Sequence, residues 1–322
     1  MKLIRFVFLF ALMLSCENPE KSDYTFYYWR THLSFDKSEK EALNKATTTY
    51  LYTRFFDIEK VEEKFQPVAV ITKEESFQTE KQIVPVVYIK NEIFYGITRD
   101  EITFLAENMA ALILKKQKQF KFKNSDEIQI DCDWTAGTNK EYFAFLEKLK
   151  EVSGKLITCT LRLHQVKNSK LSGIPPVEKV YLMCYSTSSP LENNGRNSIL
   201  DLPTLKNYLK NIHLYPLAMD IALPIYSWGI VTNHLGKHQL INGLSCADLD
   251  RPEFEKTSES EAKILEDGFY FGNYLNKGFT LKVEEITQDH LKEVKSYLRK
   301  KIGPYKIVYY HLDGKFVDRP EL

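Results

Sequence analysis

The chain lacks the features that mark several large classes of protein. Its 322 residues include 44 Lys and Arg and 43 Asp and Glu, so the net charge of +1 offers no basic surface of the kind that nucleic-acid binding requires. No apolar run is followed by a G-x-G-x-x-G or Walker-type loop, which argues against a nucleotide-binding open sheet. The nucleophile elbow G-x-S-x-G is absent as well. We therefore expect no nucleic-acid partner and no cofactor.

Cysteine is also scarce, with five in the whole chain and no C-x-x-C pair that would indicate a zinc site. Cys132, Cys159 and Cys184 fall in predicted strands, at positions opposite in parity to the polar strand residues. We expect them to face the apolar side as small hydrophobic residues, although disulfides remain an alternative. His234 and His238 are four residues apart but lie in a glycine-containing loop, so they do not predict a metal site.

Long hydrophobic runs are missing too, apart from one at the N-terminus. Residues 6–14 are apolar, follow two basic residues and are too short to span a bilayer as a stable helix. They are followed by Ser15 and Cys16, and the stretch Leu-Met-Leu-Ser-Cys resembles a bacterial lipobox. This resemblance implies a lipoprotein signal peptide at 1–15 and lipidation of Cys16. A cleaved signal with an incidental cysteine and an N-terminal anchor helix are the alternatives.

Residues 16–23 are polar and read as a short tether. The N-terminus as a whole therefore predicts a bacterial cell-envelope location, with the chain anchored to a membrane by lipid and the outer membrane favoured. Lipidation separates experimentally from the other two alternatives, because only lipidation requires the Cys16 thiol.

Strand-like and helix-like stretches alternate along the rest of the chain. Such alternation predicts an α/β fold with a parallel sheet, and the number of apolar strands favours a (β/α)8 TIM-like barrel. The predicted strands are 24–30, 49–56, 67–72, 83–89, 127–133, 155–164, 177–185, 217–226 and 306–311. The predicted helices are 36–48, 100–120, 138–152, 201–211 and 288–301. Turns and short strands at about 230–285 predict a β-rich insertion after strand seven, within a single barrel domain at 24–322.

The octet 128–135 carries the strongest functional signal. Successive strand side chains point to opposite faces, so Asp131 and Asp133 share one face while Cys132 and Trp134 share the other. Two carboxylates on an apolar strand are costly unless they are paired or used, and burial predicts a perturbed pKa for at least one of them. We take Asp131 and Asp133 as candidate catalytic residues.

Further polar and aromatic side chains fall where other predicted strands end, which is the functional face of a (β/α)8 barrel. Aromatic faces mixed with charged groups suit a sugar, since rings stack on its C–H faces and hydroxyls take hydrogen bonds. The candidate substrate-binding residues are Trp29, Arg54, Arg162, His164, Tyr185, Tyr226 and Trp228. The alternative is structural, with Arg54–Asp57 and Arg162–Asp131 as ordinary buried ion pairs.

Three of these strands resemble those of family-18 chitinase-like glycoside hydrolases. Asp131-Cys-Asp133-Trp134 is similar to the core of the Asp-x-x-Asp-x-Asp-x-Glu strand, 183–185 to the Met-x-Tyr strand, and 223–229 to the Leu-Pro-Phe-Tyr-Gly strand. The chain as a whole also resembles TIM-barrel-like lipoproteins of Bacteroidetes. The first Asp of the motif falls on Ile128, and the Glu that serves as general acid falls on Thr135.

The resemblance implies a glycan or polysaccharide partner, with Asp131 and Asp133 as relay carboxylates and Tyr185 holding the substrate's polar group. Trp228 or Tyr226 would line a sugar subsite. Because Thr135 replaces the acid, two functions stay open: a glycoside hydrolase-like enzyme, and a non-catalytic glycan-binding or surface lipoprotein. A structural envelope protein without a ligand is the third possibility.

Overall fold

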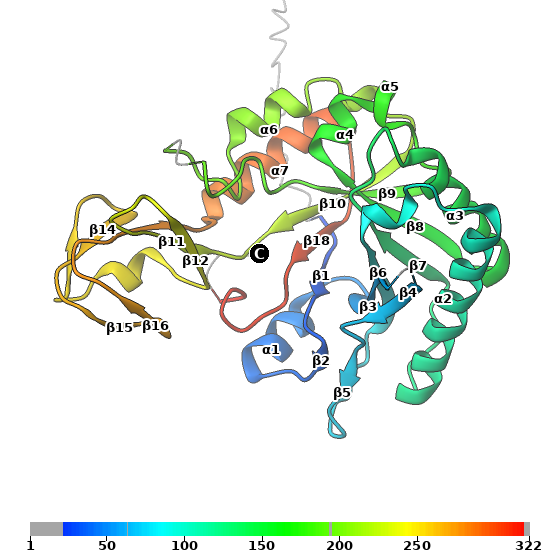
Figure 1. Cartoon of the computed structure of the whole chain (residues 1–322), viewed down its shortest axis with the longest axis horizontal. Helices are drawn as coiled ribbons and strands as arrows, with labels where there is room; N and C mark the ends of the chain where they lie inside the picture. The colour runs from blue at the N-terminus through cyan, green and yellow to red at the C-terminus, as the bar shows by residue number, and fades with distance from the viewer. Residues whose placement is uncertain (1–21, 63, 193–194, 319–322) are drawn as a thin grey trace, which may run out of the picture.

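The computed structural model describes residues 22–62, 64–192 and 195–318. Eight parallel strands close into a barrel, because the first of them pairs with both the second and the last (Figure 1). The barrel strands are β1 (Tyr24–Tyr28), β3 (Tyr50–Val61), β6 (Gln82–Ile89), β7 (Glu127–Asp131), β8 (Leu156–Arg162), β9 (Lys179–Met183), β10 (Ala218–Pro224) and β18 (Ile307–Tyr310). The predicted barrel is confirmed.

Helices cover the outside of the barrel. They are α1 (Lys37–Lys45), α2 (Arg99–Phe120), α3 (Asn139–Ser153), α4 (Leu163–Lys167), α5 (Ser169–Ser172), α6 (Leu202–Tyr208) and α7 (Gln288–Ile302), with 3-10 turns at η1 (Asn91–Phe94), η2 (Ile212–Leu214) and η3 (Cys246–Leu249). The longest begins at Thr98, whose hydroxyl accepts from the backbone of Glu101 while the Glu101 carboxylate accepts from the backbone of Thr98. This reciprocal capping fixes the start of α2 one residue before the predicted position.

The second barrel unit departs from the (β/α)8 pattern. Among the described residues no helix lies between β3 and β6. Instead β3 runs on beyond the barrel and pairs antiparallel with β4 (Lys64–Val68), while β5 (Thr72–Lys73) pairs with β2 (His32–Leu33). The predicted strand at 67–72 is therefore not a barrel strand, because it divides between this hairpin and a short side sheet.

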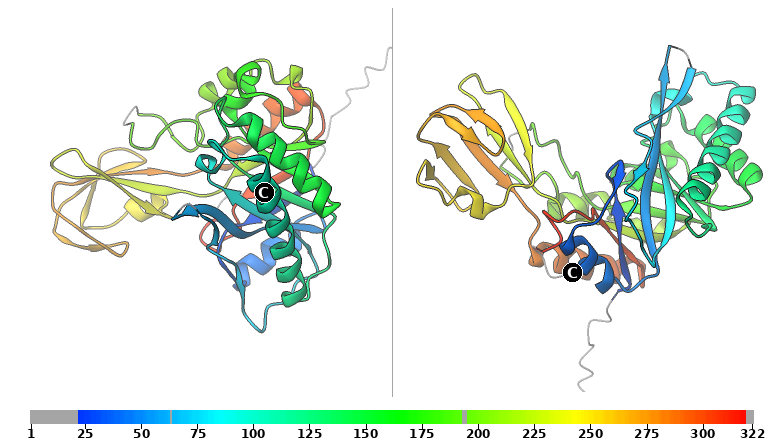
Figure 2. Two further views of the ribbon diagram at one scale, coloured as in Figure 1. Left: turned by 45° about the vertical axis from the view of Figure 1, so that its right-hand side comes forward. Right: turned by 90° about the horizontal axis from the view of Figure 1, so that it is seen from below.

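The insertion after strand seven is present as predicted, between β10 and α7. It forms a five-stranded antiparallel sheet in the order β12-β11-β17-β14-β13 and a separate hairpin of β15 and β16. The strands are β11 (Trp228–Thr232), β12 (His238–Asn242), β13 (Phe254–Lys256), β14 (Glu261–Ile264), β15 (Gly268–Tyr270), β16 (Asn273–Leu275) and β17 (Thr280–Glu284). Figure 2 (right) shows the insertion and the β3–β4 hairpin projecting to the same side of the barrel from opposite flanks.

The insertion has a small hydrophobic core of its own, built around residues such as Val231, Leu244 and Leu281. Gly229 sits where a Cβ atom would approach Leu244 Cδ1 to 2.5 Å and Leu281 Cδ1 to 2.8 Å. Glycine is required there because a side chain would displace two core leucines.

The predicted facing of the cysteines is confirmed. Cys132, Cys159 and Cys184 are buried in the main core, and all four cysteines in the described part of the chain are free. Within the described ranges no helix is long and apolar enough to cross a membrane.

Candidate functional site

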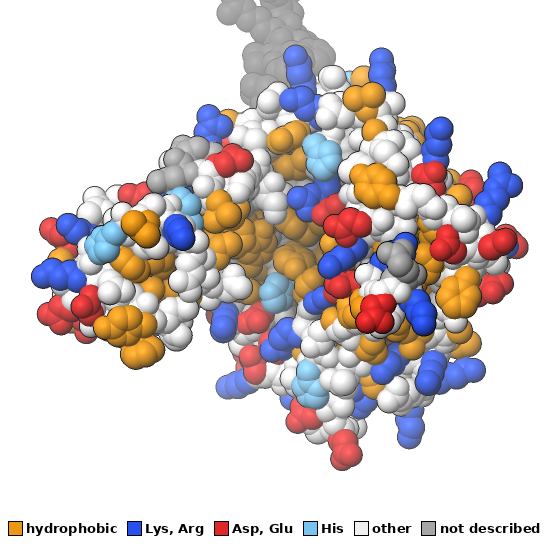
Figure 3. All heavy atoms as spheres, viewed as in Figure 1, with side chains coloured by type: hydrophobic (Ala, Val, Ile, Leu, Met, Phe, Trp, Pro, Cys, Tyr) orange, Lys and Arg blue, Asp and Glu red, His pale blue; other side chains and the backbone are white. Residues whose placement is uncertain are grey.

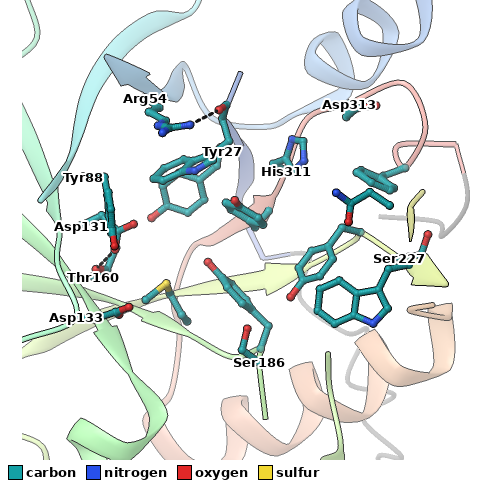
Figure 4. A pocket seen from close by; sticks show the side chains of 18 of the residues that line it. Tyr27, Arg54, Tyr88, Asp131, Asp133, Thr160, Ser186, Ser227, His311 and Asp313 are labelled. Carbon is teal, nitrogen blue, oxygen red and sulfur yellow. Dashed lines mark hydrogen bonds between the residues drawn. The ribbon is translucent and has the colours of Figure 1, made fainter. Parts of the chain in front are cut away.

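A cavity of about 620 Å³ opens at the carboxyl ends of the barrel strands, between the barrel and the insertion. Figure 3 shows this hollow, with hydrophobic side chains deep inside and charged side chains on the barrel's side of it. Its lining comprises Tyr27, Trp29, Arg54, Asp57, Tyr88, Asp131, Asp133, Thr160, Arg162, Met183, Tyr185, Ser186, Tyr226, Ser227, Trp228, Asn242, Tyr310, His311, Asp313, Lys315 and Phe316. Figure 4 shows how most of these side chains point into it.

The two candidate carboxylates lie on one side of this cavity. Asp131 is the last residue of β7, and its Oδ1 accepts a hydrogen bond of 2.6 Å from the Thr160 hydroxyl. Burial raises the pKa of Asp131 to about 6, and the hydrogen bond from Thr160 acts in the opposite direction by lowering this pKa. The perturbed pKa expected for this pair is confirmed for Asp131. Near neutral pH a measurable fraction of this carboxyl is therefore protonated.

Asp133 follows two residues later and forms the ion pair of this wall. Its Oδ1 lies 3.4 Å from Arg162 Nη1, and both side chains are partly exposed. The structure thus joins Arg162 to Asp133, whereas the sequence had suggested Asp131 as its structural partner. Arg162 still lowers the pKa of Asp131 through its charge. Both carboxylates face the same guanidinium, so this wall combines hydrogen-bond acceptors with a fixed cation.

A second ion pair lies on β3, two barrel strands away from β7. Arg54 donates from Nε to Asp57 Oδ1 at 2.7 Å, and its Nη2 also contacts the other carboxylate oxygen. The guanidinium lies 5.6 Å from the ring centre of Trp29 and donates to its carbonyl. The Arg54–Asp57 pair suggested by the sequence is present, and it borders the cavity.

Aromatic rings form the remaining wall, with Tyr310 at their centre. The ring centres of Trp29, Tyr185 and Tyr226 lie 5.6, 5.4 and 5.8 Å from that of Tyr310, and Tyr185 stacks on it. Trp228 extends the cluster, 5.3 Å from Tyr226. Rings held by one another lose little freedom when a ligand stacks on them, which favours binding of C–H faces.

Trp228 is fixed by the insertion. Its Nε1 donates to Glu284 Oε2 at 2.9 Å, and the buried Glu284 also accepts from Ser198 and pairs with Lys282 at 2.8 Å. A buried carboxylate that is fully paired is rigid, so it holds the indole at the edge of the cavity.

The position that carries the acid in the resembled motif lies outside the cavity lining. β7 ends at Asp131, and Thr135 is exposed in the turn that precedes α3. Its backbone N–H donates to Thr138 Oγ1 at 3.0 Å, and Thr138 donates to Asn91 at 2.6 Å. Thr135 therefore helps to organise the start of a helix.

One sequence-predicted site residue is not brought into the cavity. His164 is exposed on α4 and is not part of the lining. The predicted strand 155–164 ends early, because β8 stops at Arg162 and the chain turns into helix at Leu163. The strand parity used to place His164 beside Arg162 does not apply beyond that point.

Several lining residues were missed from the sequence, chiefly Tyr27, Tyr88, Thr160 and Tyr310. Tyr27 lies two residues before Trp29 and Thr160 two before Arg162, so strand parity could have found them. His311 borders the cavity, and burial lowers its pKa. Its Nδ1 and the Oδ1 of Asp133 have no hydrogen-bond partner among the described residues, and the same holds for Gln129 Nε2 below them. These are polar atoms that a ligand or water can satisfy.

Metal binding is not indicated by the described residues, which contain no group of three or more potential ligands. The cavity offers hydrogen-bonding carboxylates, two paired guanidinium groups and stacked rings, so it can bind a ligand that has both polar groups and apolar faces.

No protein-family model matches this chain, and no curated protein matches it in sequence. Solved structures do resemble it. A chitinase from Chromobacterium violaceum superposes with a TM-score of 0.55 at 12% identity, covering 92% of this chain and 97% of that one. The spore cortex-lytic enzyme SleL of Bacillus cereus superposes with a TM-score of 0.55 at 14% identity, covering 92% of this chain and 72% of that one.

A class V chitinase from Nicotiana tobaccum superposes with a TM-score of 0.52 at 10% identity, covering 91% of this chain and 95% of that one. A mutant of that chitinase was solved in complex with NAG4. The chain therefore has the closed TIM-barrel fold of the family-18-like chitinases and of SleL.

Proposed function

We propose that this protein binds a glycan in the barrel-mouth cavity and does not hydrolyse it by the substrate-assisted mechanism. The observation that carries the proposal is the pairing of an aromatic wall around Tyr310 with a carboxylate wall at Asp131 and Asp133 across one cavity. Its volume of about 620 Å³ lies in the range of small-ligand sites.

The two walls match the two kinds of surface on a sugar. Trp29, Tyr185 and Trp228 offer ring surfaces for C–H faces, and Asp133 and Asn242 offer acceptors and donors for hydroxyl or amide groups. The Oδ1 of Asp133 lies in an ion pair with Arg162 but accepts no hydrogen bond from the described residues, so a ligand hydroxyl or amide can donate to it. The chitinase-like fold and the NAG4 complex of one structural neighbour support a chito-oligosaccharide as the first ligand to try.

Thr135 is the reason to propose binding without substrate-assisted hydrolysis. Glycoside cleavage needs an acid that protonates the leaving oxygen, and threonine cannot serve. In addition, Thr135 is not part of the cavity lining and lies in a turn held by Thr138.

Hydrolysis is kept as a second candidate because of Asp131. Its pKa of about 6 leaves part of the carboxyl protonated near neutral pH, as a general acid requires. Asp133 lies two residues later in the chain and borders the same cavity. A pair of carboxylates beside the scissile bond is the usual means of glycoside hydrolysis.

Chitotetraose binding measured by calorimetry tests the main proposal. We expect binding by the parent and a roughly tenfold to hundredfold loss in Trp29→Ala, since removing one stacking ring costs about 1–3 kcal/mol. Phe269→Ala is the matched control, because this ring is 81% exposed on the β15–β16 hairpin outside the cavity. An equal loss in both variants, or no binding by the parent, would contradict the proposal.

Product release from the same oligosaccharide separates binding from hydrolysis. We expect no release by the parent. If release is seen and disappears in Asp131→Asn while binding persists, the second candidate replaces the first.

We also propose that the chain is exported and anchored to a membrane of the bacterial cell envelope through lipid on Cys16. This residue lies outside the described residues, and the proposal rests on the lipobox resemblance. In cells fed a labelled fatty acid, Cys16→Ser should lose the label and move to soluble fractions, because acylation needs the thiol. A variant that stays in the membrane to the same extent as the parent would rule this anchor out.

A further inference from the structure

The end of the barrel opposite the cavity is where the chain enters its first strand. The Asp23 carbonyl accepts from the Ile307 backbone at 2.8 Å, and Arg299 donates to Ser22 Oγ at 3.0 Å. These residues lie at the amino ends of β1 and β18, whereas the cavity lies at the carboxyl ends. We call this end, formed by the amino ends of the barrel strands and the connections leading into them, the base.

Exposed lysines gather on the base. In a (β/α)8 barrel every covering helix runs antiparallel to the strands, so all helix C-termini meet at one end, where cations are favoured. The side chains concerned are exposed and come from the ends of four helices and the connections after them. They are Lys45, Lys121, Lys123, Lys210, Lys300 and Lys306.

Acidic side chains also lie on the base, and several are paired. Asp126 lies 3.7 Å from Lys155, and Glu178 lies 3.0 Å from Lys150. The others are Asp23, Glu80, Glu127, Glu151 and Asp220, of which Glu151 pairs with Lys148 and Asp220 with Lys179. Among the described residues none of the six lysines named above forms an ion pair, so the base is positive although the whole chain carries only +1.

An exposed apolar side chain lies on the same end of the barrel. Leu214, in η2 between α6 and β10, is 70% exposed on the base. Exposed cations together with an exposed leucine are typical of surfaces that lie on lipid headgroups.

We propose that the base lies against an anionic membrane surface, with its lysines next to lipid phosphates and the cavity opening away from the membrane. The orientation rests on the proposed anchor, because Cys16 is six residues before Ser22 and an extended chain of that length spans roughly 20 Å at most. A lipid on Cys16 would hold the base, and not the cavity, at the bilayer.

Charge then decides how firmly the base sits there. Each cation near an anionic bilayer strengthens binding about fivefold. Six lysines together would therefore hold the base against the membrane in one orientation. A soluble acidic polymer could also meet this charge. We favour a membrane because a lipid on Cys16 would bring these lysines to the bilayer surface.

Flotation with lipid vesicles tests the proposal without the anchor. Residues 22–322 contain every barrel strand and both hydrophobic cores, so this fragment is used and its cooperative melting is checked. We expect binding to phosphatidylcholine vesicles with about 30% phosphatidylglycerol, none to phosphatidylcholine alone, and release as salt rises. Changing the six base lysines to Gln should weaken binding at least tenfold.

The matched control changes six exposed lysines at the mouth end and on the insertion, and it should bind within about twofold of the parent. These are Lys37, Lys40, Lys64, Lys237, Lys263 and Lys277. Equal losses in both variants, binding to neutral vesicles, or tighter binding of polyglutamate than of the anionic vesicles would overturn the membrane assignment. Salt-sensitive vesicle binding together with a failed Cys16→Ser test would support the basic surface and remove only the lipid tether.

Discussion

Replacing Trp134 with alanine is expected to lower the free energy of unfolding by about 3–5 kcal/mol. The indole is fully buried on the outer face of the barrel wall and stacks on Tyr142 of α3, with ring centres 5.1 Å apart. Its Nε1 donates to the Ser172 carbonyl at 3.0 Å. The substitution leaves a cavity and an unpaired carbonyl, and a loss of this size is a large part of the stability of a typical domain.

Urea unfolding of two variants resolves these contributions. Trp134→Phe keeps an aromatic ring and loses the hydrogen bond, so we expect a cost of about 1–2 kcal/mol. Trp134→Ala loses both. Glycan affinity should be unchanged in Trp134→Phe, because Trp134 belongs to the motif but not to the cavity lining. A Trp134→Phe variant that folds normally and has lost its ligand would show that we have placed this residue wrongly.

The second large effect concerns Asp131. In the unfolded chain its carboxyl titrates near the ordinary pKa of 3.8, and in the folded protein burial raises the pKa to about 6. Between these values the folded protein binds a proton that the unfolded chain has lost. The free energy of unfolding therefore falls as pH rises from about 4 to 6, and the contribution remains lost above that range. The difference corresponds to roughly 3 kcal/mol.

Asp131→Asn removes this titration and keeps an oxygen that can accept from Thr160. We expect the variant to be more stable than the parent by about 2–3 kcal/mol at pH 8, and nearly equal to it at pH 4. Urea unfolding across this pH range measures the difference. Asp126→Asn, at a fully exposed side chain on the base, is the control. If the free energies of unfolding of the parent and Asp131→Asn differ by the same amount at pH 4 and at pH 8, the prediction is contradicted.

The same experiment bears on function. A carboxylate that costs stability at neutral pH is retained for a reason other than folding, and ligand binding or proton transfer are the two reasons proposed above. If Asp131→Asn stabilises the protein and abolishes glycan binding, this carboxyl belongs to the site.

The sequence alone determined what depends on neighbours along the chain. Strand periodicity placed Asp131 on one face and Cys132 on the other, because successive side chains of a strand must alternate. The sequence likewise predicted a helix at 100–120, which agrees with α2 to within one residue. The number and order of strands then favoured a barrel.

Only the tertiary structure decided which side chains meet across the barrel. Tyr310 became the centre of the aromatic wall because β18 closes the barrel beside both β1 and β10. Arg162 is paired with Asp133 although Asp131 was expected, because Asp131 is the last residue of β7 and accepts from Thr160 of β8, whereas Asp133 lies two residues beyond the strand end. No local pattern reports which partner each carboxylate meets, because register between parallel strands is set by long-range pairing.

The errors have the same physical origin. His164 was placed by continuing strand parity past the end of β8, and Thr135 by extending the resembled strand motif past the end of β7. The predicted strand at 67–72 is not a barrel strand, because it divides between the β3–β4 hairpin and the short sheet of β2 and β5. Alternation is a property of a strand and holds only within it. The sequence therefore fixed the facing of residues inside each element, whereas packing and pairing decided where each strand stops and which strand ends share the cavity.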